Sequence, residues 1–157
     1  MLFRSFNLIP TLSAEENVML PLMLDGRNGD VGSQKVNTLL QQLGLADRRD
    51  HRPDAMSGGE QQRVAIGRAL VSDPTVILAD EPTGNLDSAN SHSVCELLRD
   101  LSVNQGKTIV MVTHEPTVAS YAQEVAVLKD GKLVQRFTTA ETGGGQGLAL
   151  RYQECLK

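Results

Sequence analysis

The chain has 157 residues, of which 40% are hydrophobic, and this material suffices for one modest domain rather than two. Its formal net charge is −4 and only 3% of its residues are aromatic. We therefore expect no nucleic-acid partner, because such proteins need a basic field or side chains on which bases stack. Two cysteines are too few for a disulfide framework and suit a reducing compartment.

The first half of the chain is predicted to be mainly helical. Ser13 and Glu16 have the spacing of a capping box, which predicts a short helix from about residue 14. Ser33 is expected to cap a second helix, and Gly44 to end it. The apolar residues between them recur every three or four positions, and these are Val36, Leu39, Leu40 and Leu43. The longest apolar stretch, residues 18–24, is too short to cross a bilayer, so any membrane role should come through a partner.

The second half is predicted to alternate helices with strands. A helix over residues 59–72 should end before Pro74. The runs at 75–79 and 108–113 are continuously apolar, as expected for strands buried on both faces of a parallel sheet. Cys95 falls on the apolar stripe of the helix between them, so we expect it to pack in the core.

The C-terminal part is predicted to be a β-hairpin followed by a tail. Residues 124–129 and 132–137 are joined by Asp130-Gly131, a pair typical of tight hairpin turns. The glycine-rich segment after residue 138 predicts flexibility. The fold class is therefore α/β, with a parallel sheet core, flanking helices and a C-terminal hairpin. We expect one domain over 1–137 and a flexible tail over 138–157.

Three polar residues follow the two predicted parallel strands. Asp80 and Glu81 come at the end of the first strand, and His114 at the end of the second. Because ligands collect outside the carboxyl ends of parallel strands, we expect these side chains to converge at one edge of the sheet. A carboxylate pair at such an edge suits Mg²⁺ and an attacking water.

The run MSGGEQQR at residues 56–63 places a glycine pair at the start of a helix. A helix start offers free backbone N–H groups and the positive end of the helix dipole, which suit a phosphate. Taken alone, the run fits a plain helix cap at least as well.

In combination, these motifs resemble those of the ATP-binding-cassette (ABC) ATPases. Residues 56–63 resemble the signature motif, ADEPTGNLD at 79–87 the Walker B and D-loop, and VTH at 112–114 the H-loop. They occur in the family's order and at its typical spacing. The resemblance covers roughly residues 1–137 and is nearest to the macrolide-export and lipoprotein-release (MacB- and LolD-like) type. Residues 5–12, SFNLIPTL, resemble the continuation of that type's Q-loop. The resemblance implies part of a P-loop NTPase fold.

The resemblance also implies a role for each motif residue. Asp80 would bind Mg²⁺, Glu81 would act as the general base toward water, and His114 would contact the γ-phosphate of ATP. Ser57 and the Gly59 amide would contact the γ-phosphate of an ATP held by a second ATPase subunit. The expected nucleotide-binding set as a whole is Ser57, Gly58, Gly59, Glu60 and Asp87, with Asp87 linking the two sites.

Two features depart from the family pattern. Arg4 stands where the family has the Q-loop glutamine, and guanidinium is a donor only, so it cannot replace a glutamine carbonyl beside a metal. The 157 residues also contain no phosphate-binding Walker A loop of the form G-x-x-x-x-G-K-[ST]. The nearest run, QGKT at 105–108, has Leu101 in place of the first glycine and follows a helix instead of a strand. We therefore expect the chain to lack the Walker A portion of the family.

The expected function is an ATP-binding and ATP-hydrolysing subunit of an ABC exporter or lipoprotein-release system. Its cofactors would be ATP and Mg²⁺. Its partners would be a second ATPase subunit, identical or different, and an integral membrane permease that docks near residues 3–24. The subunit would be cytoplasmic, peripheral to the inner face of the plasma membrane through the permease.

Two other functions are compatible with the sequence. The chain could be a truncated, non-catalytic ABC-like module that dimerises or docks without hydrolysing ATP alone. A Walker A encoded in frame upstream of Met1 would favour the enzyme, and its absence the module. An ABC-like ATPase of DNA repair is disfavoured, because the run at 81–87 is unusual there and no basic stripe is present.

Overall fold

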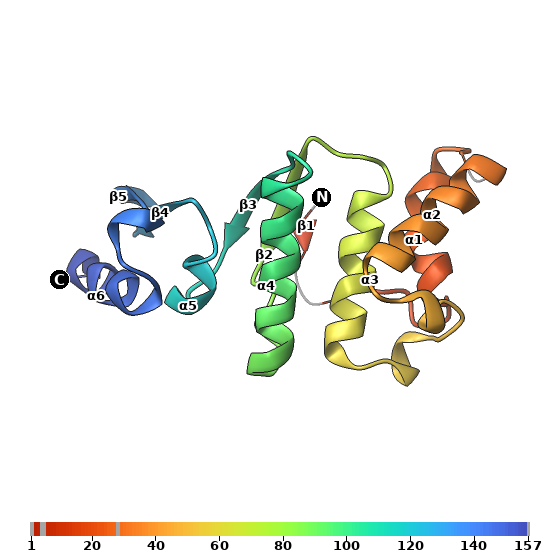
Figure 1. The fold of residues 1–157 in the computed structure, drawn as a ribbon, viewed down its shortest axis with the longest axis horizontal. Coiled ribbons are helices and arrows are strands. Elements are labelled where there is room, and N and C mark those ends of the chain that lie inside the picture. The colour runs from red at the N-terminus through yellow and green to blue at the C-terminus, as the bar shows by residue number, and fades with distance from the viewer. Residues whose placement is uncertain (1, 4–5, 28, 157) are drawn as a thin grey trace.

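The computed structural model describes residues 2–3, 6–27 and 29–156, and Figure 1 shows three groups of elements arranged side by side. A helical group lies at one end, a small sheet with one long helix in the middle, and a hairpin with two helices at the other end. No helix within the described ranges is long and apolar enough to cross a membrane.

The helical group contains three α-helices and two short 3-10 turns. Their bounds are α1 (Ala14–Leu24), α2 (Asp30–Gln42), η1 (Ala46–Arg48), η2 (Pro53–Ala55) and α3 (Gly58–Leu70). The main hydrophobic core lies between these helices, and residues of α4 extend it. The capping box of α1 is confirmed, since Ser13 Oγ accepts from the Glu16 amide and the Glu16 carboxylate accepts from the Ser13 amide. Helix α2 begins three residues before Ser33, with Gly29 as its N-cap.

The central sheet is parallel, with the strand order β1 (Leu2–Phe3), β2 (Val76–Asp80), β3 (Thr108–Val112). Helix α4 (Ser88–Val103) connects β2 to β3 and crosses in front of the sheet in Figure 1. The register pairs Asp80, the last residue of β2, with Val112, the last residue of β3. The predicted helices, parallel strands and core position of Cys95 are therefore confirmed.

One face of the sheet is more exposed than the apolar strand sequences predicted. Ile77 is buried and Ile109 packs against the main core, but Val110 and Val112, on the other face of β3, are 50% and 57% exposed. Val76 and Leu78 are exposed on the corresponding side of β2. The expectation of burial on both faces was wrong, because an apolar run shows that a strand tolerates burial but not how many of its faces are covered.

The predicted hairpin is confirmed as β4 (Glu124–Lys129) and β5 (Lys132–Thr138). Its connection is Asp130-Gly131, and both residues have positive φ, 52° and 74°. This is the backbone that a two-residue hairpin turn of the favoured twist requires. The short helix α5 (Pro116–Ala119) lies between β3 and the hairpin.

The C-terminal segment differs from the expected flexible tail. It forms a 3-10 turn, η3 (Thr139–Glu141), and a helix, α6 (Gly145–Leu156). Leu148 is buried in a second, smaller hydrophobic cluster with Val127 and Phe137 of the hairpin, and Tyr152, one helical turn later, packs against it. These contacts order the segment, while its glycines occupy the turn before α6 and the first turn of the helix.

The open face of the sheet should make the chain self-associate. Replacing Val110 and Val112 together by threonine keeps the shape and the strand propensity but removes two exposed methyl groups. When two such faces meet, both chains lose two methyl groups, and at about 0.8 kcal/mol for each group buried the association constant should fall on the order of a hundredfold. Sedimentation velocity at several concentrations measures this change.

The matched control is Val103→Thr, because Val103 is 62% exposed at the end of α4, away from this face. It should leave the association constant unchanged. A wild-type chain that stays a monodisperse monomer at high concentration would contradict the prediction.

Candidate functional site

Glu81 occupies a strained backbone position at the end of β2. Its φ is +46°, in the left-handed region that a residue with a Cβ rarely adopts. Such a conformation costs on the order of 1–3 kcal/mol and persists only where neighbours hold it. Here the Glu81 amide donates to the carbonyl of Val112 at 2.8 Å, which fixes the turn against β3.

The Glu81 carboxylate is held by three donors from the residues after β3. Oε1 lies 3.1 Å from the His114 amide nitrogen and 2.7 Å from His114 Nδ1, and Oε2 accepts from Thr113 Oγ1 at 3.3 Å. Thr113 Oγ1 in turn accepts from the Glu115 amide at 3.1 Å. The carboxylate therefore has one defined orientation at the sheet edge. Its contact with the imidazole raises the pKa of His114, first through the hydrogen bond and then through charge attraction.

The predicted convergence at the sheet edge is confirmed for Glu81 and His114, which are in direct contact. Asp80 immediately precedes Glu81 and pairs with Val112, so it lies at the same end of the two strands. A cavity of about 330 Å³ opens beside Glu81 and His114.

The described residues contain no group of three or more His, Cys, Asp or Glu side chains that could hold a metal ion by themselves. The sequence analysis predicts one metal-binding residue, Asp80. A single carboxylate fits Mg²⁺, which commonly takes one or two carboxylates and completes its shell with waters and substrate phosphates.

The predicted phosphate site lies at the N-terminus of α3. Ser57 is the N-cap: its Oγ accepts from the Glu60 amide at 3.3 Å, and its own amide donates to Glu60 Oε2 at 2.7 Å. That second bond is the main cause of the lowered pKa of Glu60. The amides of Gly58 and Gly59 donate to no acceptor in the described part of the chain. Two uncommitted amides at the positive end of a helix fit a phosphate.

The glycine pair also serves packing, because two other segments approach it closely. A Cβ on Gly58 would lie 3.2 Å from Leu86 and 3.6 Å from the ring of Phe6. A Cβ on Gly59 would lie 2.2 Å from Asn90 Oδ1 and 2.7 Å from its Cγ, closer than atoms can approach. A side chain at Gly59 would therefore require Asn90 to move, whereas one at Gly58 would require only a small shift of Leu86.

Asp87 is engaged within its own helix. It caps α4, and its two carboxylate oxygens accept from the Asn90 amide at 2.9 Å and from Asn90 Nδ2 at 2.7 Å. These bonds lower the pKa of Asp87. Asn90 thus connects Asp87 to the start of α3, a connection that the sequence analysis missed. The spacing of Asp87 and Asn90, three residues apart at a helix start, is the signal that could have revealed it.

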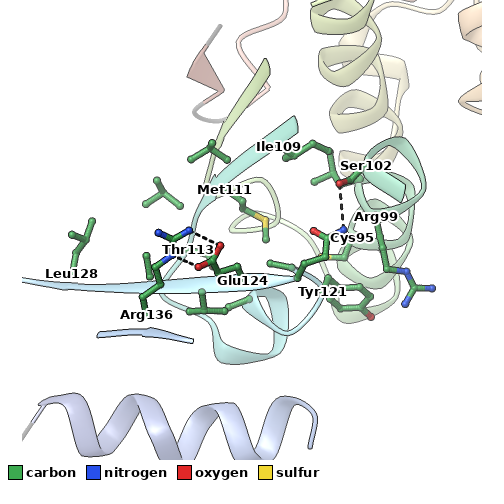
Figure 2. Close-up of a pocket in the computed structure, with 18 of the residues that line it drawn as sticks. Cys95, Arg99, Ser102, Ile109, Met111, Thr113, Tyr121, Glu124, Leu128 and Arg136 are labelled. Atoms are coloured by element: carbon green, nitrogen blue, oxygen red, sulfur yellow. Dashed lines mark hydrogen bonds and ion pairs between the residues drawn. The ribbon is translucent and has the colours of Figure 1, made fainter. Parts of the chain in front are cut away.

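A second, larger groove is a different site. It has a volume of about 620 Å³ and lies between β3, α4 and the hairpin, and neither Glu81 nor His114 lines it. Figure 2 shows Ile109, Met111 and Cys95 around it, with the Arg136–Glu124 ion pair across the groove from Cys95. Burial raises the pKa of the Cys95 thiol to about 11, so this thiol is not a nucleophile at neutral pH. The groove is therefore separate from the predicted phosphate site at the start of α3.

Arg4, which stands where the family has the Q-loop glutamine, lies outside the described residues. Phe6 and Asn7, just beyond it, are held by α3: the buried guanidinium of Arg68 donates to the carbonyl of Asn7 at 2.8 Å and to that of Phe6 at 3.3 Å.

Comparison with known proteins identifies the family. The family model described as ABC transporter matches residues 1–84, more than half of the chain. The chain belongs to the ABC transporter family. It is 52% identical over 132 residues to the macrolide export ATP-binding/permease protein MacB of Chlorobaculum tepidum, covering 84% of this chain and 20% of that protein. It is 48% identical to the uncharacterized ABC transporter ATP-binding protein MJ1508 of Methanocaldococcus jannaschii, covering 85% of this chain and 59% of that protein.

Solved structures confirm the ABC ATPase fold. The structure titled as a dimeric, post-hydrolysis state of the ATP-binding cassette MJ0796 has a TM-score of 0.75 and 41% identity, over 87% of this chain and 61% of that one. A second dimeric structure of MJ0796 has a TM-score of 0.73 at 42% identity, with the same coverage. The chain therefore has part of the P-loop NTPase fold of a MacB- or LolD-like ATP-binding protein, and it spans less than two thirds of these relatives.

Gly59→Ala should destabilise the fold through Asn90. The new Cβ displaces the Asn90 amide and breaks its bond to the Asp87 carboxylate, which should cost about 1–3 kcal/mol. In an Asn90→Ala background the same change should cost much less, because only the contact with the residue-90 Cβ at 3.2 Å remains and alanine favours a helix over glycine by up to about 1 kcal/mol. Urea unfolding of the four chains measures the coupling. Equal costs in both backgrounds would show that Asn90 is not the obstacle.

The pKa of His114 should be above its ordinary value, and Glu81→Gln should lower it toward that value. Because the folded pKa is raised, this contact stabilises the fold fully below the ordinary histidine pKa and loses its effect as the pH rises through the raised value. A titration of the imidazole followed by NMR measures the shift. Asp47→Asn, a change of charge in the distant turn η1, should leave the pKa of His114 unaltered. The hypothesis fails if the Glu81→Gln chain titrates like the wild type.

Proposed function

We propose that the chain is the ATP-binding and ATP-hydrolysing part of an ABC exporter or lipoprotein-release system, in which it powers a membrane permease. The observation that carries this proposal is the held carboxylate of Glu81, next to Asp80 and in contact with His114, in a chain of this family. The names of the relatives support export, since the MacB proteins are described as macrolide export ATP-binding/permease proteins.

The chemistry would be phosphoryl transfer from ATP to water, which needs positioning and charge neutralisation more than covalent catalysis. Asp80 would hold Mg²⁺, which supplies positive charge beside the phosphates. Glu81 is the general base in this proposal, and its carboxylate is already oriented by Thr113 and His114. A protonated His114 is a suitable donor to the γ-phosphate, and Glu81 favours that protonated form.

The start of α3 would act on the nucleotide of a second ATPase subunit. Ser57, Gly58 and Gly59 present a hydroxyl and two uncommitted amides, and Glu60 keeps Ser57 in the capping geometry. Asp87 would link the two sites across the dimer, and Asn90 holds it beside α3. The dimeric structures of MJ0796, one bound to ADP and Pi, support this arrangement by analogy.

The permease would dock on the N-terminal part of the chain. Ile9, Met23 and Leu24 are exposed apolar residues of that region. The chain would then work in the cytoplasm, at the inner face of the plasma membrane, and the permease would select the transported macrolide, lipoprotein or other substrate.

The alternative is a non-catalytic ABC-like module that dimerises or docks but does not hydrolyse ATP alone. The observation that favours it is the lack of a G-x-x-x-x-G-K-[ST] loop in the 157 residues. Such a loop supplies several charge-assisted hydrogen bonds of about 1.5–3 kcal/mol each. Without three of them the affinity for ATP should be several thousand-fold weaker, millimolar or worse.

A mixed assay tests whether the start of α3 supports ATP hydrolysis in a dimer. This chain is added to a full-length relative whose own signature serine is substituted, so that its nucleotide site can be completed only by Ser57 of this chain. We expect ATP turnover to return, and Ser57→Arg to reduce it by about 10²–10³, the typical effect of removing one such donor.

Sedimentation of the same mixtures is the control. Turnover that is restored by the wild-type chain but not by Ser57→Arg, with equal dimer formation, supports the proposed role of the α3 start in a working ATPase dimer. Dimer formation without turnover supports the non-catalytic module. Absence of both at high concentration of each chain would contradict both proposals.

A further inference from the structure

Helix α6 is anchored to the hairpin and to α5 along most of its length (Figure 1). At its start, a Cβ on Gly145 would be in ordinary contact with Thr117 and Ser120, at 3.7–3.9 Å, so α6 begins directly against α5 and the residue after it. In its middle, Leu148 is only 2% exposed and packs with Val127 and Phe137.

Polar contacts extend this anchoring to the other end of α6. The guanidinium of Arg151 lies 4.9 Å from the centre of the Phe137 ring and 3.3 Å from the Glu141 carboxylate. Cys155 Sγ donates to Gln135 Oε1 of β5 at 2.7 Å. These contacts place α6 in one orientation over the hairpin.

Helix α5 depends on this support. It has four residues, Pro116–Ala119, too few for a helix to be stable without tertiary contacts. Ala119 packs against the same cluster as Leu148. The first residue of α5 is the second residue after His114, so the position of α5 sets where the chain leaves the His114 turn.

A shared cavity brings α6 close to the candidate site itself. Glu81, Thr113 and His114 line one part of the 330 Å³ cavity, and Phe137, Leu148 and Tyr152 line another. Two residues of the C-terminal helix therefore border the same space as the proposed general base and its histidine. The bond from the Glu115 amide to Thr113 Oγ1 connects the start of α5 back to the Glu81 carboxylate.

We propose that α6 is a brace for the candidate site, in which Leu148 is a positioning residue that holds α5 and, through it, the His114 turn against Glu81. The catalytic meaning of this brace rests on the proposed function of Glu81 and His114. The mechanical connection from α6 through α5 to His114 does not depend on it.

The experiment is an ¹⁵N–¹H NMR comparison of the full chain at constant pH, with the His114 backbone amide as the readout, since that amide donates to Glu81 Oε1. The Glu81→Gln chain gives the reference position for an altered bond. Leu148→Ala leaves a cavity under α6, and it should move the His114 resonance from its wild-type position toward that reference. Leu148→Met, which keeps the volume, should restore the wild-type position.

The matched control is Leu150→Ala, on the same helix, because Leu150 is 65% exposed. It should leave the His114 resonance in place, and the α2 resonances should stay fixed in all variants. Should Leu148→Ala unfold the chain, the smaller change Leu148→Val is measured against the same criteria. Shifted α5 and α6 resonances with an unmoved His114 amide would overturn the brace. A failure of the mixed ATPase assay would not, because the NMR experiment needs no nucleotide.

Discussion

The hydrogen bond from the Glu81 amide to the Val112 carbonyl is the constraint on which the candidate site depends. It continues the parallel pairing of β2 with β3 one residue past Asp80, and it holds Glu81 in the left-handed region. In that conformation the carboxylate reaches the residues that follow β3, which supply three donors. The register of two paired strands, each packed against the core on one face, thus fixes the orientation of an acidic side chain. The strain at Glu81 is the local cost of this arrangement.

At the start of α3, packing and phosphate binding both favour glycine. Gly58 and Gly59 leave their amides uncommitted, as a phosphate site requires, and they also allow Leu86 and Asn90 to approach α3. The side-chain amide of Asn90 donates to Asp87, so the start of α3 and the Asp87 carboxylate are held together through Asn90. A side chain at Gly59 would disturb the phosphate site and Asp87 together, even though the two residues lie 28 positions apart in the sequence.

The sequence predicted where the polar residues of the candidate site lie, but not the exposed face of the sheet or the C-terminal helix. Asp80, Glu81 and His114 could be placed because each follows an apolar strand, and parallel topology brings strand ends together. Val110 and Val112 were misjudged because an apolar residue does not reveal whether another element covers it. Helix α6 was missed because the glycine-rich run at 143–147 predicts flexibility, whereas the tertiary contacts of Leu148 and Tyr152 order the segment as a helix.

The candidate site lies between two hydrophobic clusters of unequal size. The larger cluster lies between the four helices α1, α2, α3 and α4 and one face of the sheet. The smaller cluster lies between α6 and the hairpin. Met111, which packs against the larger cluster, and Phe137, from the smaller one, line the same cavity as Glu81 and His114. Regions with few buried apolar contacts open at lower free energy than the main core. Glu81 therefore belongs to the more stable part of the molecule, whereas the stretch from His114 into α5 depends on the less stable part. A site divided in this way keeps the backbone of Glu81 fixed by the pairing with β3, while the histidine turn that orients its carboxylate has a separate, weaker support.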